Sequence, residues 1–540
     1  MYCIYCGTDN PAGARFCQNC GRELLEDTDT TPSEERTEVV AVDTAEEVTL
    51  SAEQPTESAK KHPKMLAIAM AVVTVLTAMA LMVWMLWPAA AYGKPKVTLL
   101  AFYDTETNTS VVLADDRVVA TVEDNAGSGV NMVDMALDGT ASLLIRRDER
   151  VLYYISEKGA EQVTSNPRTY ALSADGSTVA YITVNNRLML RDFRAGREAE
   201  RVADRVLSTK LVISTDGSTV MYVCERKDSG MTDLYAYNDG KEYKLGQNLT
   251  PIAASSKGRY LYVRSGSRCY VMDLNGEKTP LSDSPPSAIT LNRDGTQAMI
   301  STSKGSFLSA WGGEVTQVAD QKLQLCTPQW TRCHRAVDCA IYDVDDLYGK
   351  VWEEASGKIY LVDQKAEAHK LAEKDAESPN VTLSGDGETL YYVPTGGSDL
   401  YAVGVSVEVS PQKLADGVSW FAVSPNGKYV CVQNADGELC TPSGDRIADR
   451  ATDVCFTCKN ILLFRNNGVL YACKDGRTAE KLADRVMGVG VTATAAYYMT
   501  VDGEVYASNG DIAFTRVIQT RVEYPPTGYT DGGAIIEGLS

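Results

Sequence analysis

The chain has 540 residues, of which 44% are hydrophobic and 23% are charged, a balance that is ordinary for a globular protein and excludes a wholly disordered or fibrous chain. The formal net charge of -20 has the wrong sign for attracting phosphate backbones, so nucleic acid is not an expected partner. Only three histidines are present, and because histidine is the commonest general base and metal ligand, most hydrolytic and metal-dependent enzyme classes lose support.

Four cysteines near the start have the spacing of a zinc site. Cys3 and Cys6 form one C-x-x-C pair, and Cys17 and Cys20 form a second pair. Each pair can place two thiolates on one side of a tight turn, and four thiolates at about 2.3 Å complete a tetrahedral zinc shell. Two disulfides or a redox motif are the competing interpretations, but paired C-x-x-C motifs favour zinc. The predicted metal ligands are therefore these four cysteines.

With its four cysteines, the segment 3–21 resembles the short zinc-ribbon domains at the N-termini of many bacterial membrane proteins. The resemblance implies a zinc ribbon, which we place at residues 1–25. A closed shell of four thiolates leaves no open coordination position, so the zinc is expected to be structural and not catalytic. Acidic residues balance Arg15 and Arg22, so we expect this domain to contact protein and not nucleic acid.

Residues 26–64 are predicted to be an acidic, extended linker. Their first 34 residues hold eleven acidic side chains, one basic side chain (Arg36) and no aromatic side chain. Such a composition cannot bury enough apolar surface to offset the entropy of ordering the chain.

Residues 65–87 are predicted to form one transmembrane helix. The segment MLAIAMAVVTVLTAMALMVWMLW has no charge, no polar face and the length of one bilayer crossing. Trp84, Trp87 and Tyr92 cluster at its end, where amphipathic rings favour the headgroup zone. A buried globular helix is an alternative, as is processing at Ala89–Ala91, which resembles a signal-peptide cleavage site.

Two arguments place the N-terminus in the cytoplasm. Three lysines flank the N-terminal side of the apolar segment and two flank the other side, in keeping with the positive-inside rule. The cysteine cluster adds support, because free thiolates survive best in a reducing compartment. Residues 97–540 are therefore expected outside the cytoplasm, and the chain is expected to be a single-pass cell-membrane protein.

From residue 97 the sequence repeats about every forty residues. Successive copies carry a polar turn with glycine between strands that are rich in Val, Tyr and Ile. The turn glycines are Gly139, Gly176, Gly217, Gly258, Gly295, Gly387 and Gly427. They lie 37 to 41 residues apart except for one step of 92, which conceals a degenerate copy. Four short strands per forty residues is the size of one propeller blade.

These copies resemble the blades of TolB-type and WD-repeat-like β-propellers. The segment Ser424-Pro425-Asn426-Gly427-Lys428 matches the Ser-Pro-Asp-Gly-Lys turn of that family with one change, Asn for Asp. The resemblance implies an all-β propeller, which we place at residues 97–524, followed by a tail at 525–540. About nine or ten units can be counted, more than the 4–8 usual blades. We therefore expect one ring of seven or eight blades with some half-blades, or two smaller rings.

The ends of this region are expected to meet. Val97–Asp104 precedes the first clear copy and Ala513–Tyr524 follows the last, and both segments are rich in strand-forming residues. Because closing a ring removes free sheet edges, we expect the two segments to pair.

Ten cysteines lie beyond the predicted membrane segment. They are Cys224, Cys269, Cys326, Cys333, Cys339, Cys431, Cys440, Cys455, Cys458 and Cys473. Most are expected to be reduced and buried, although one or two disulfides are possible in an oxidising compartment. Cys431 and Cys440 could pair only across a two-residue turn at Ala435-Asp436. The pair Cys455 and Cys458 has no second C-x-x-C partner for zinc.

No catalytic or cofactor-binding residue is predicted. The sequence has no G-x-S-x-G nucleophile elbow, and His334 and His369 lie in no catalytic motif. The acids at 343, 345 and 346 lack the spacing of a calcium loop. Three tryptophans could line a binding face or pack between blades: Trp330, Trp352 and Trp420.

The sequence therefore favours a membrane-anchored protein that is not an enzyme and whose propeller binds a protein, peptide or glycan. Two alternatives remain: a propeller hydrolase or lyase of the cell envelope, and a transmembrane assembly or sensing protein.

Overall fold

The computed structural model describes residues 92–522, apart from 124–129, 147–148, 227–229, 311–314, 332, 337–338 and 376–380. The chain divides into two compact units, Met1–Met85 and Leu86–Ser540, and every described residue belongs to the second. The predicted zinc ribbon, acidic linker, transmembrane helix and tail all lie outside the described residues. Within the described ranges, no helix has the length and apolar character needed to cross a bilayer.

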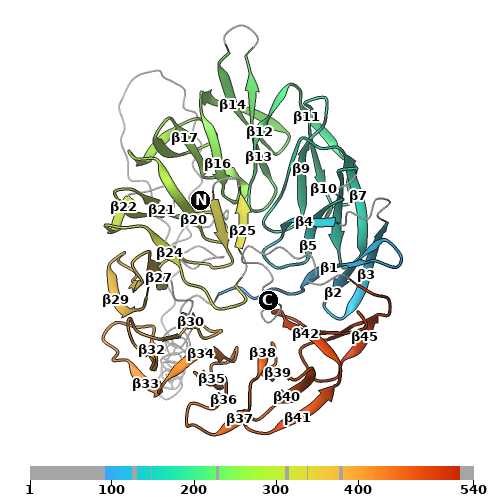
Figure 1. The fold of residues 1–540 in the computed structure, drawn as a ribbon. Coiled ribbons are helices and arrows are strands. Elements are labelled where there is room, and N and C mark those ends of the chain that lie inside the picture. Colours follow the sequence, from blue (N-terminus) through green and yellow to red (C-terminus); the bar gives the residue numbers. More distant parts are fainter. Residues whose placement is uncertain are drawn as a thin grey trace, which may run out of the picture. The chain divides into compact units, whose positions relative to one another are not determined.

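The described residues form eleven β-sheets that follow one another in chain order (Figure 1). Each sheet is built on a meander of antiparallel strands, and we call each sheet a blade. Blade 1 contains β1 (Leu99–Asp104), β2 (Thr109–Ala114) and β3 (Arg117–Glu123). Blade 2 contains β4 (Val130–Met135), β5 (Ala141–Arg146), β6 (Val151–Ser156) and β7 (Gly159–Ser165). Blade 3 contains β8 (Thr169–Leu172), β9 (Thr178–Ile182), β10 (Leu188–Asp192) and β11 (Glu200–Ala203).

The next three blades include a short 3-10 helix, in blade 5, and an added hairpin, on blade 6. Blade 4 contains β12 (Val206–Ile213), β13 (Thr219–Glu225), β14 (Thr232–Asn238) and β15 (Lys241–Gln247). Blade 5 contains β16 (Thr250–Ala254), the 3-10 helix η1 (Ser256–Gly258), β17 (Leu261–Ser265), β18 (Arg268–Met272) and β19 (Lys278–Ser282). Blade 6 contains β20 (Pro286–Leu291), β21 (Gln297–Thr302), β22 (Gly305–Ala310) and β23 (Val315–Ala319). A hairpin of β25 (Cys333–Ala336) and β26 (Cys339–Tyr342) extends blade 6 to six strands.

The remaining blades are four-stranded. Blade 7 contains β24 (Leu323–Leu325), β27 (Lys350–Glu354), β28 (Lys358–Val362) and β29 (Ala368–Glu373). Blade 8 contains β30 (Val381–Leu383), β31 (Thr389–Tyr392), β32 (Leu400–Gly404) and β33 (Gln412–Ala415). Blade 9 contains β34 (Val418–Val423), β35 (Val430–Asn434), β36 (Leu439–Cys440) and β37 (Arg446–Ala448). Blade 10 contains β38 (Thr452–Phe456), β39 (Leu462–Asn466), β40 (Val469–Cys473) and β41 (Ala479–Ala483). Blade 11 contains β42 (Val486–Val491), β43 (Ala496–Thr500), β44 (Val505–Ser508) and β45 (Thr515–Ile518).

The strands of a blade differ in burial according to their place in the sheet. In blade 3, every residue of the second strand β9 is buried, whereas the fourth strand β11 has none that is fully buried. A strand that is covered on both faces reads as a continuous apolar run, and TVAYI in β9 has that pattern. The hydrophobic core is therefore divided among the spaces between blades.

Clusters of buried apolar side chains join each blade to the next. They connect blades 1–2, 2–3, 3–4, 4–5, 5–6, 6–7, 7–8, 8–9, 9–10 and 10–11 in turn. A further cluster joins blade 11 to blade 1, where the rings of Phe102 and Tyr497 lie 6.4 Å apart. The contacts thus run through all eleven blades and return to the first, which closes one ring.

The predictions of seven or eight blades and of half-blades are therefore wrong, and so is the alternative of two rings. Each glycine turn lies between the first and second strands of a complete blade. The step of 92 residues hides blade 7, whose first strand β24 and second strand β27 are separated by the insertion that carries the β25–β26 hairpin. The sequence periodicity indicated nine or ten units. The expected number of blades was set lower because propellers usually have 4–8 blades.

The two ends meet, but as neighbouring blades and not as one shared blade. β1 pairs with β2, and β45 pairs with β44. Between the ends there is one antiparallel bridge, Asp104 to Val522, and the amide of Thr105 donates to the carbonyl of Arg521 at 3.0 Å. The ring therefore closes mainly through side-chain packing.

Candidate functional site

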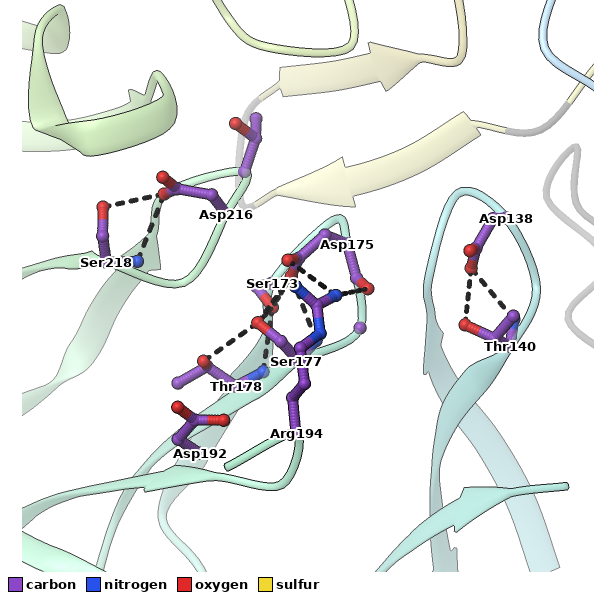
Figure 2. A network of polar contacts seen from close by, with 12 residues as sticks. Asp138, Thr140, Ser173, Asp175, Ser177, Thr178, Asp192, Arg194, Asp216 and Ser218 are labelled. Carbon is purple, nitrogen blue, oxygen red and sulfur yellow. Dashed lines mark hydrogen bonds and ion pairs between the residues drawn. The ribbon is translucent and has the colours of Figure 1, made fainter. Parts of the chain in front are cut away.

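The Asp-Gly turns between the first and second strands are built by a repeated hydrogen-bond pattern (Figure 2). In blade 3, the hydroxyl of Ser173 donates to a carboxylate oxygen of Asp175 at 2.6 Å and accepts from the amide of Thr178 at 3.0 Å. The same oxygen of Asp175 accepts from the amide and the hydroxyl of Ser177 at 3.0 and 2.8 Å. Such local bonds satisfy turn groups that no strand can pair, so the role of these side chains is structural.

These turns also pack on the following blade. The amide of Asp175 donates to the carbonyl of Thr215 at 2.9 Å. At Gly217, which has φ of 75°, a Cβ atom would lie 2.4 Å from the hydroxyl oxygen of Thr178. Glycine is required there both by the positive φ and by the close approach of the neighbouring blade.

The turns define one face of the ring. In an antiparallel meander, the turn after the first strand and the turn after the third strand lie at the same end of the blade. Figure 2 shows this in blade 3, where Arg194, from the turn after the third strand, forms an ion pair with Asp175 at 3.1 Å. We call this side the DG face, and the side with the turns after the second strands the opposite face.

Residues 92–98 cross the centre of the ring along the DG face. The Tyr92 side chain is 6% exposed, its hydroxyl donates to the carbonyl of Cys326 at 3.2 Å, and the Lys350 ammonium lies 5.1 Å from its ring centre. Lys96 reaches Asp138 of blade 2 at 2.9 Å. The interpretation of Tyr92 as a headgroup anchor beside Trp84 and Trp87 is therefore wrong, because the ring is packed inside the propeller.

The β25–β26 hairpin also lies at the centre of the ring. β26 pairs in parallel with β20, the first strand of blade 6. The Nδ1 atom of His334 lies 3.0 Å from the carbonyl oxygen of Met135 and 3.2 Å from a carboxylate oxygen of Asp134, so the hairpin is fastened to blade 2 as well. Burial raises the pKa of Asp134. His334 is therefore a buried group that fastens the hairpin to blade 2.

A hollow of about 340 Å³ lies between blades 7 and 8, and we call it the junction hollow. Its lining includes Gln324, Cys326, Glu353, Glu354, Val381 and Thr382. Lys322, which precedes the first strand of blade 7, and Ala355, which follows the second strand, also line it. Both positions lie at the end of blade 7 away from the Asp-Gly turns, whereas Thr327 follows the first strand at its other end. The hollow therefore runs between the two blades and reaches the opposite face.

The ionisable groups in the junction hollow are poorly suited to catalysis. Burial raises the pKa of the Cys326 thiol well above its usual range, so the nucleophilic thiolate is scarce. Glu353 is held in an ion pair at 2.7 Å by Lys374, whose side chain is 3% exposed. Glu354 accepts a hydrogen bond from the Tyr360 hydroxyl at 3.3 Å. Sequence reasoning missed these groups because they come from β27, β28 and two separate loop positions with no shared motif.

Two further cavities differ from the junction hollow in size. A pocket of about 70 Å³ on the DG face is lined by Tyr92, Lys94, Trp330 and Pro425 among others. A broad groove of about 830 Å³ lies along the short strands of blade 9 and is rimmed by Lys428 and Arg477.

The acidic and histidine candidates lie in separate places. Asp343 and Asp345 both pair with Arg293 on the DG face. Asp346 accepts the amide of Tyr348 at 2.9 Å in the same loop. His369, in β29, lies 3.0 Å from Asp363, in the turn before that strand, and both side chains are partly buried. The exposed Glu367 is the third member of this group.

The tryptophans and cysteines behave mainly as packing residues. Trp352 is fully buried in blade 7, Trp420 packs partly buried in blade 9, and Trp330 lines the small pocket. None of the ten cysteines in the described ranges forms a disulfide. Cys440 is the strand partner of Val432 and not of Cys431, so the one cross-strand disulfide considered from the sequence is absent. The zinc ligands Cys3, Cys6, Cys17 and Cys20 lie outside the described residues.

Comparison with known proteins identifies one domain by sequence. Residues 2–24 match the zinc-ribbon domain family. The matched segment contains the four predicted ligands, and the match suggests that the domain binds zinc. No curated protein matches the chain at a significant level.

Among solved structures, the similarities are distant. The putative TolB from Agrobacterium tumefaciens is 18% identical over 41% of this chain and 88% of its own, with a TM-score of 0.27. An oligogalacturonate lyase in complex with manganese is 12% identical over 64% and 95%, with a TM-score of 0.30. A eukaryotic initiation factor is 10% identical over 79% and 97%, with a TM-score of 0.32. Similarity at this level says nothing about activity, and the chain is described by its parts: an N-terminal zinc-ribbon domain and an eleven-bladed β-propeller.

Proposed function

We propose that this chain is a bacterial single-pass membrane protein whose propeller lies outside the cytoplasm and binds a protein, peptide or glycan. The cytoplasmic zinc ribbon binds one structural zinc and contacts another protein. The membrane anchor rests on the apolar segment 65–87, and the orientation rests on the flanking lysines.

The observation that supports binding is the junction hollow. Its volume of about 340 Å³ suits a side chain of a partner or a small glycan unit. One wall is apolar, through Val381 and Leu390, and the other is polar, through Gln324 and Glu353. Because Cys326 is a protonated thiol and Glu353 is paired with Lys374, the hollow offers recognition groups and no activated nucleophile.

The test is to fill the hollow. Peptide and glycan arrays are probed with the purified full chain in detergent, and any ligand found is titrated against Thr382→Trp. The matched control is Thr121→Trp, an exposed position on the outer strand β3. We expect Thr382→Trp to weaken binding at least about tenfold, because the indole occupies the ligand volume. Equal affinity for both variants would place the ligand elsewhere.

The zinc ribbon is tested separately. Four cysteines in two C-x-x-C pairs are the donor set of a closed zinc shell, and a segment of this length lacks a core of its own. We expect the full chain to carry about one zinc per molecule and to lose it in the Cys3→Ser and Cys17→Ser variants. Less than half an equivalent in the unaltered protein, measured by elemental analysis, would contradict the zinc site.

A further inference from the structure

The chain enters the propeller at a defined place. Tyr92 forms an isolated antiparallel bridge with Val344, and a Cβ atom at Gly387, in an Asp-Gly turn of blade 8, would lie 2.4 Å from its ring. The amide of Gly93 donates to the carbonyl of Asp343, and Lys96 pairs with Asp138. Residues 92–96 are thus bonded to the turns of the DG face, at the centre of the ring.

The distance from this point to the predicted membrane segment is short. Five Cα–Cα steps separate Trp87, the last residue of that segment, from Tyr92. A fully extended chain covers about 3.5 Å per residue, so these steps span at most about 17 Å. A strand of five residues is itself about 17 Å long and the turns at its two ends add to that length, so a tether of this length ends short of the opposite face.

We propose that the DG face is turned toward the lipid bilayer and that the opposite face, with the junction hollow, points away from it. This inference rests on the membrane anchoring of the proposed function. In this orientation the DG face lies against the bilayer surface. The junction hollow then stays accessible to a partner in solution or on another surface.

The charges of the DG face are compatible with this position. Asp138 accepts a hydrogen bond from the Thr140 hydroxyl and forms an ion pair with Lys96. Asp175 forms an ion pair with Arg194. Carboxylates compensated in this way repel anionic headgroups less than free ones would, because the paired cation lies within a Debye length.

The orientation is tested by depth-dependent quenching. The full chain is reconstituted into liposomes that contain doxyl-labelled lipids, with a fluorophore attached through p-azidophenylalanine at one position. Glu277 and Lys474 lie in turns after third strands, on the DG face, and Ser267 and Asn467 lie in turns after second strands of the same two blades. Since a five-residue strand is about 17 Å long, we expect quenching about twofold or more stronger at 277 and 474.

A spacer variant serves as the control. A Gly-Ser segment of about twenty residues between Ala90 and Ala91 has an end-to-end distance of about 25 Å, which frees the propeller from the membrane surface. In that variant we expect the difference between the two faces to disappear. If it persists, the short tether is not its cause and the inference is wrong.

The two proposals fail in different ways. Release of the unmodified chain from membranes by alkaline carbonate would contradict the membrane anchor itself. Retention in the membrane with equal quenching on both faces, or with stronger quenching at Ser267 and Asn467, would overturn only the orientation.

Discussion

At the residue scale, the glycine of the Asp-Gly turn at Gly217 serves two purposes, and the chain allows them to be separated. Gly217 has a φ of 75° and faces Thr178 of the preceding blade, whereas Gly196 has a φ of 62° with no atom near its missing Cβ. Alanine at positive φ costs about 1–2 kcal/mol in either place. Only at Gly217 does the neighbouring blade also have to move.

We therefore expect Gly217→Ala to lower the free energy of unfolding by about 2–4 kcal/mol and Gly196→Ala by about 1 kcal/mol. Urea unfolding of the full chain in detergent, followed by tryptophan fluorescence, gives both values. If the two variants lose the same amount of stability, the turn at Gly217 does not depend on packing against the preceding blade.

The pair of His334 and Asp134 predicts a pH dependence of stability. Burial raises the folded pKa of Asp134 above 3.8, so the folded state holds this proton more tightly than the unfolded state does. Its contribution to stability is complete below pH 3.8 and is lost as the pH rises through the raised pKa.

Asp134→Asn removes this titration and keeps an oxygen that can accept from His334. The stability of the variant minus that of the unaltered protein should therefore increase as the pH rises from 3.8, and then level off. Unfolding free energies of both proteins at a series of pH values provide the check. A difference that stays constant over this range would show that Asp134 does not titrate in the folded protein.

At the element scale, the sequence predicted what is local and missed what is distant. Asp-Gly and Asn-Gly turns need positive φ, and apolar β-branched and aromatic runs fit buried strands. The turns that start at Ser173 and Ser424, and the strands that follow them, could therefore be predicted from the sequence. The β25–β26 hairpin was missed because its partners are β20 and Asp134, far away in the sequence. The junction hollow was missed for the same reason, since Glu353 and Thr382 meet only after blades 7 and 8 pack together.

Strand register also decides the state of the cysteines. Cys431 lies in β35 beside Val432, and Val432 is the residue opposite Cys440. Successive side chains of a strand point to opposite faces, so a shift of one residue places the two sulfur atoms on different sides of blade 9. A disulfide between them would require the register to slip.

We expect the ten cysteines beyond residue 97 to remain free thiols even in protein purified without reductant. Non-reducing peptide mapping by mass spectrometry, after alkylation in denaturant, tests this. Detection of a peptide that joins Cys431 to Cys440 would contradict the register of β35 and β36.

At the scale of the whole molecule, ring closure depends on one interface, between blades 1 and 11. Blade 1 has three strands, and it packs on blade 11 through Phe102, Val111 and Tyr497, among others. The hydroxyl of Tyr497 donates to the carbonyl of Asp115 at 2.7 Å. Each other blade is held by neighbours that are adjacent in sequence, whereas this pair is separated by almost the entire propeller.

Truncation after residue 512 should therefore affect the entire ring. It removes β45 and the bridge between Asp104 and Val522, and it exposes the edge of β44 together with the apolar surface around Val505, the residue that pairs with Ile518. An unpaired edge beside exposed apolar surface promotes aggregation and proteolysis. We expect the 1–512 chain to aggregate, or to be degraded well beyond its new end.

The matched control ends after residue 524, which keeps β45 and the bridge and removes only the predicted tail. We expect this chain to melt at the temperature of the full chain, because every described contact between blades 1 and 11 is retained. Differential scanning calorimetry and limited proteolysis of the two truncations distinguish the cases. If the 1–512 chain unfolds cooperatively at an unchanged temperature, the junction between blades 1 and 11 does not hold the ring closed, and the stability must come from the ten interfaces between blades that are adjacent in sequence.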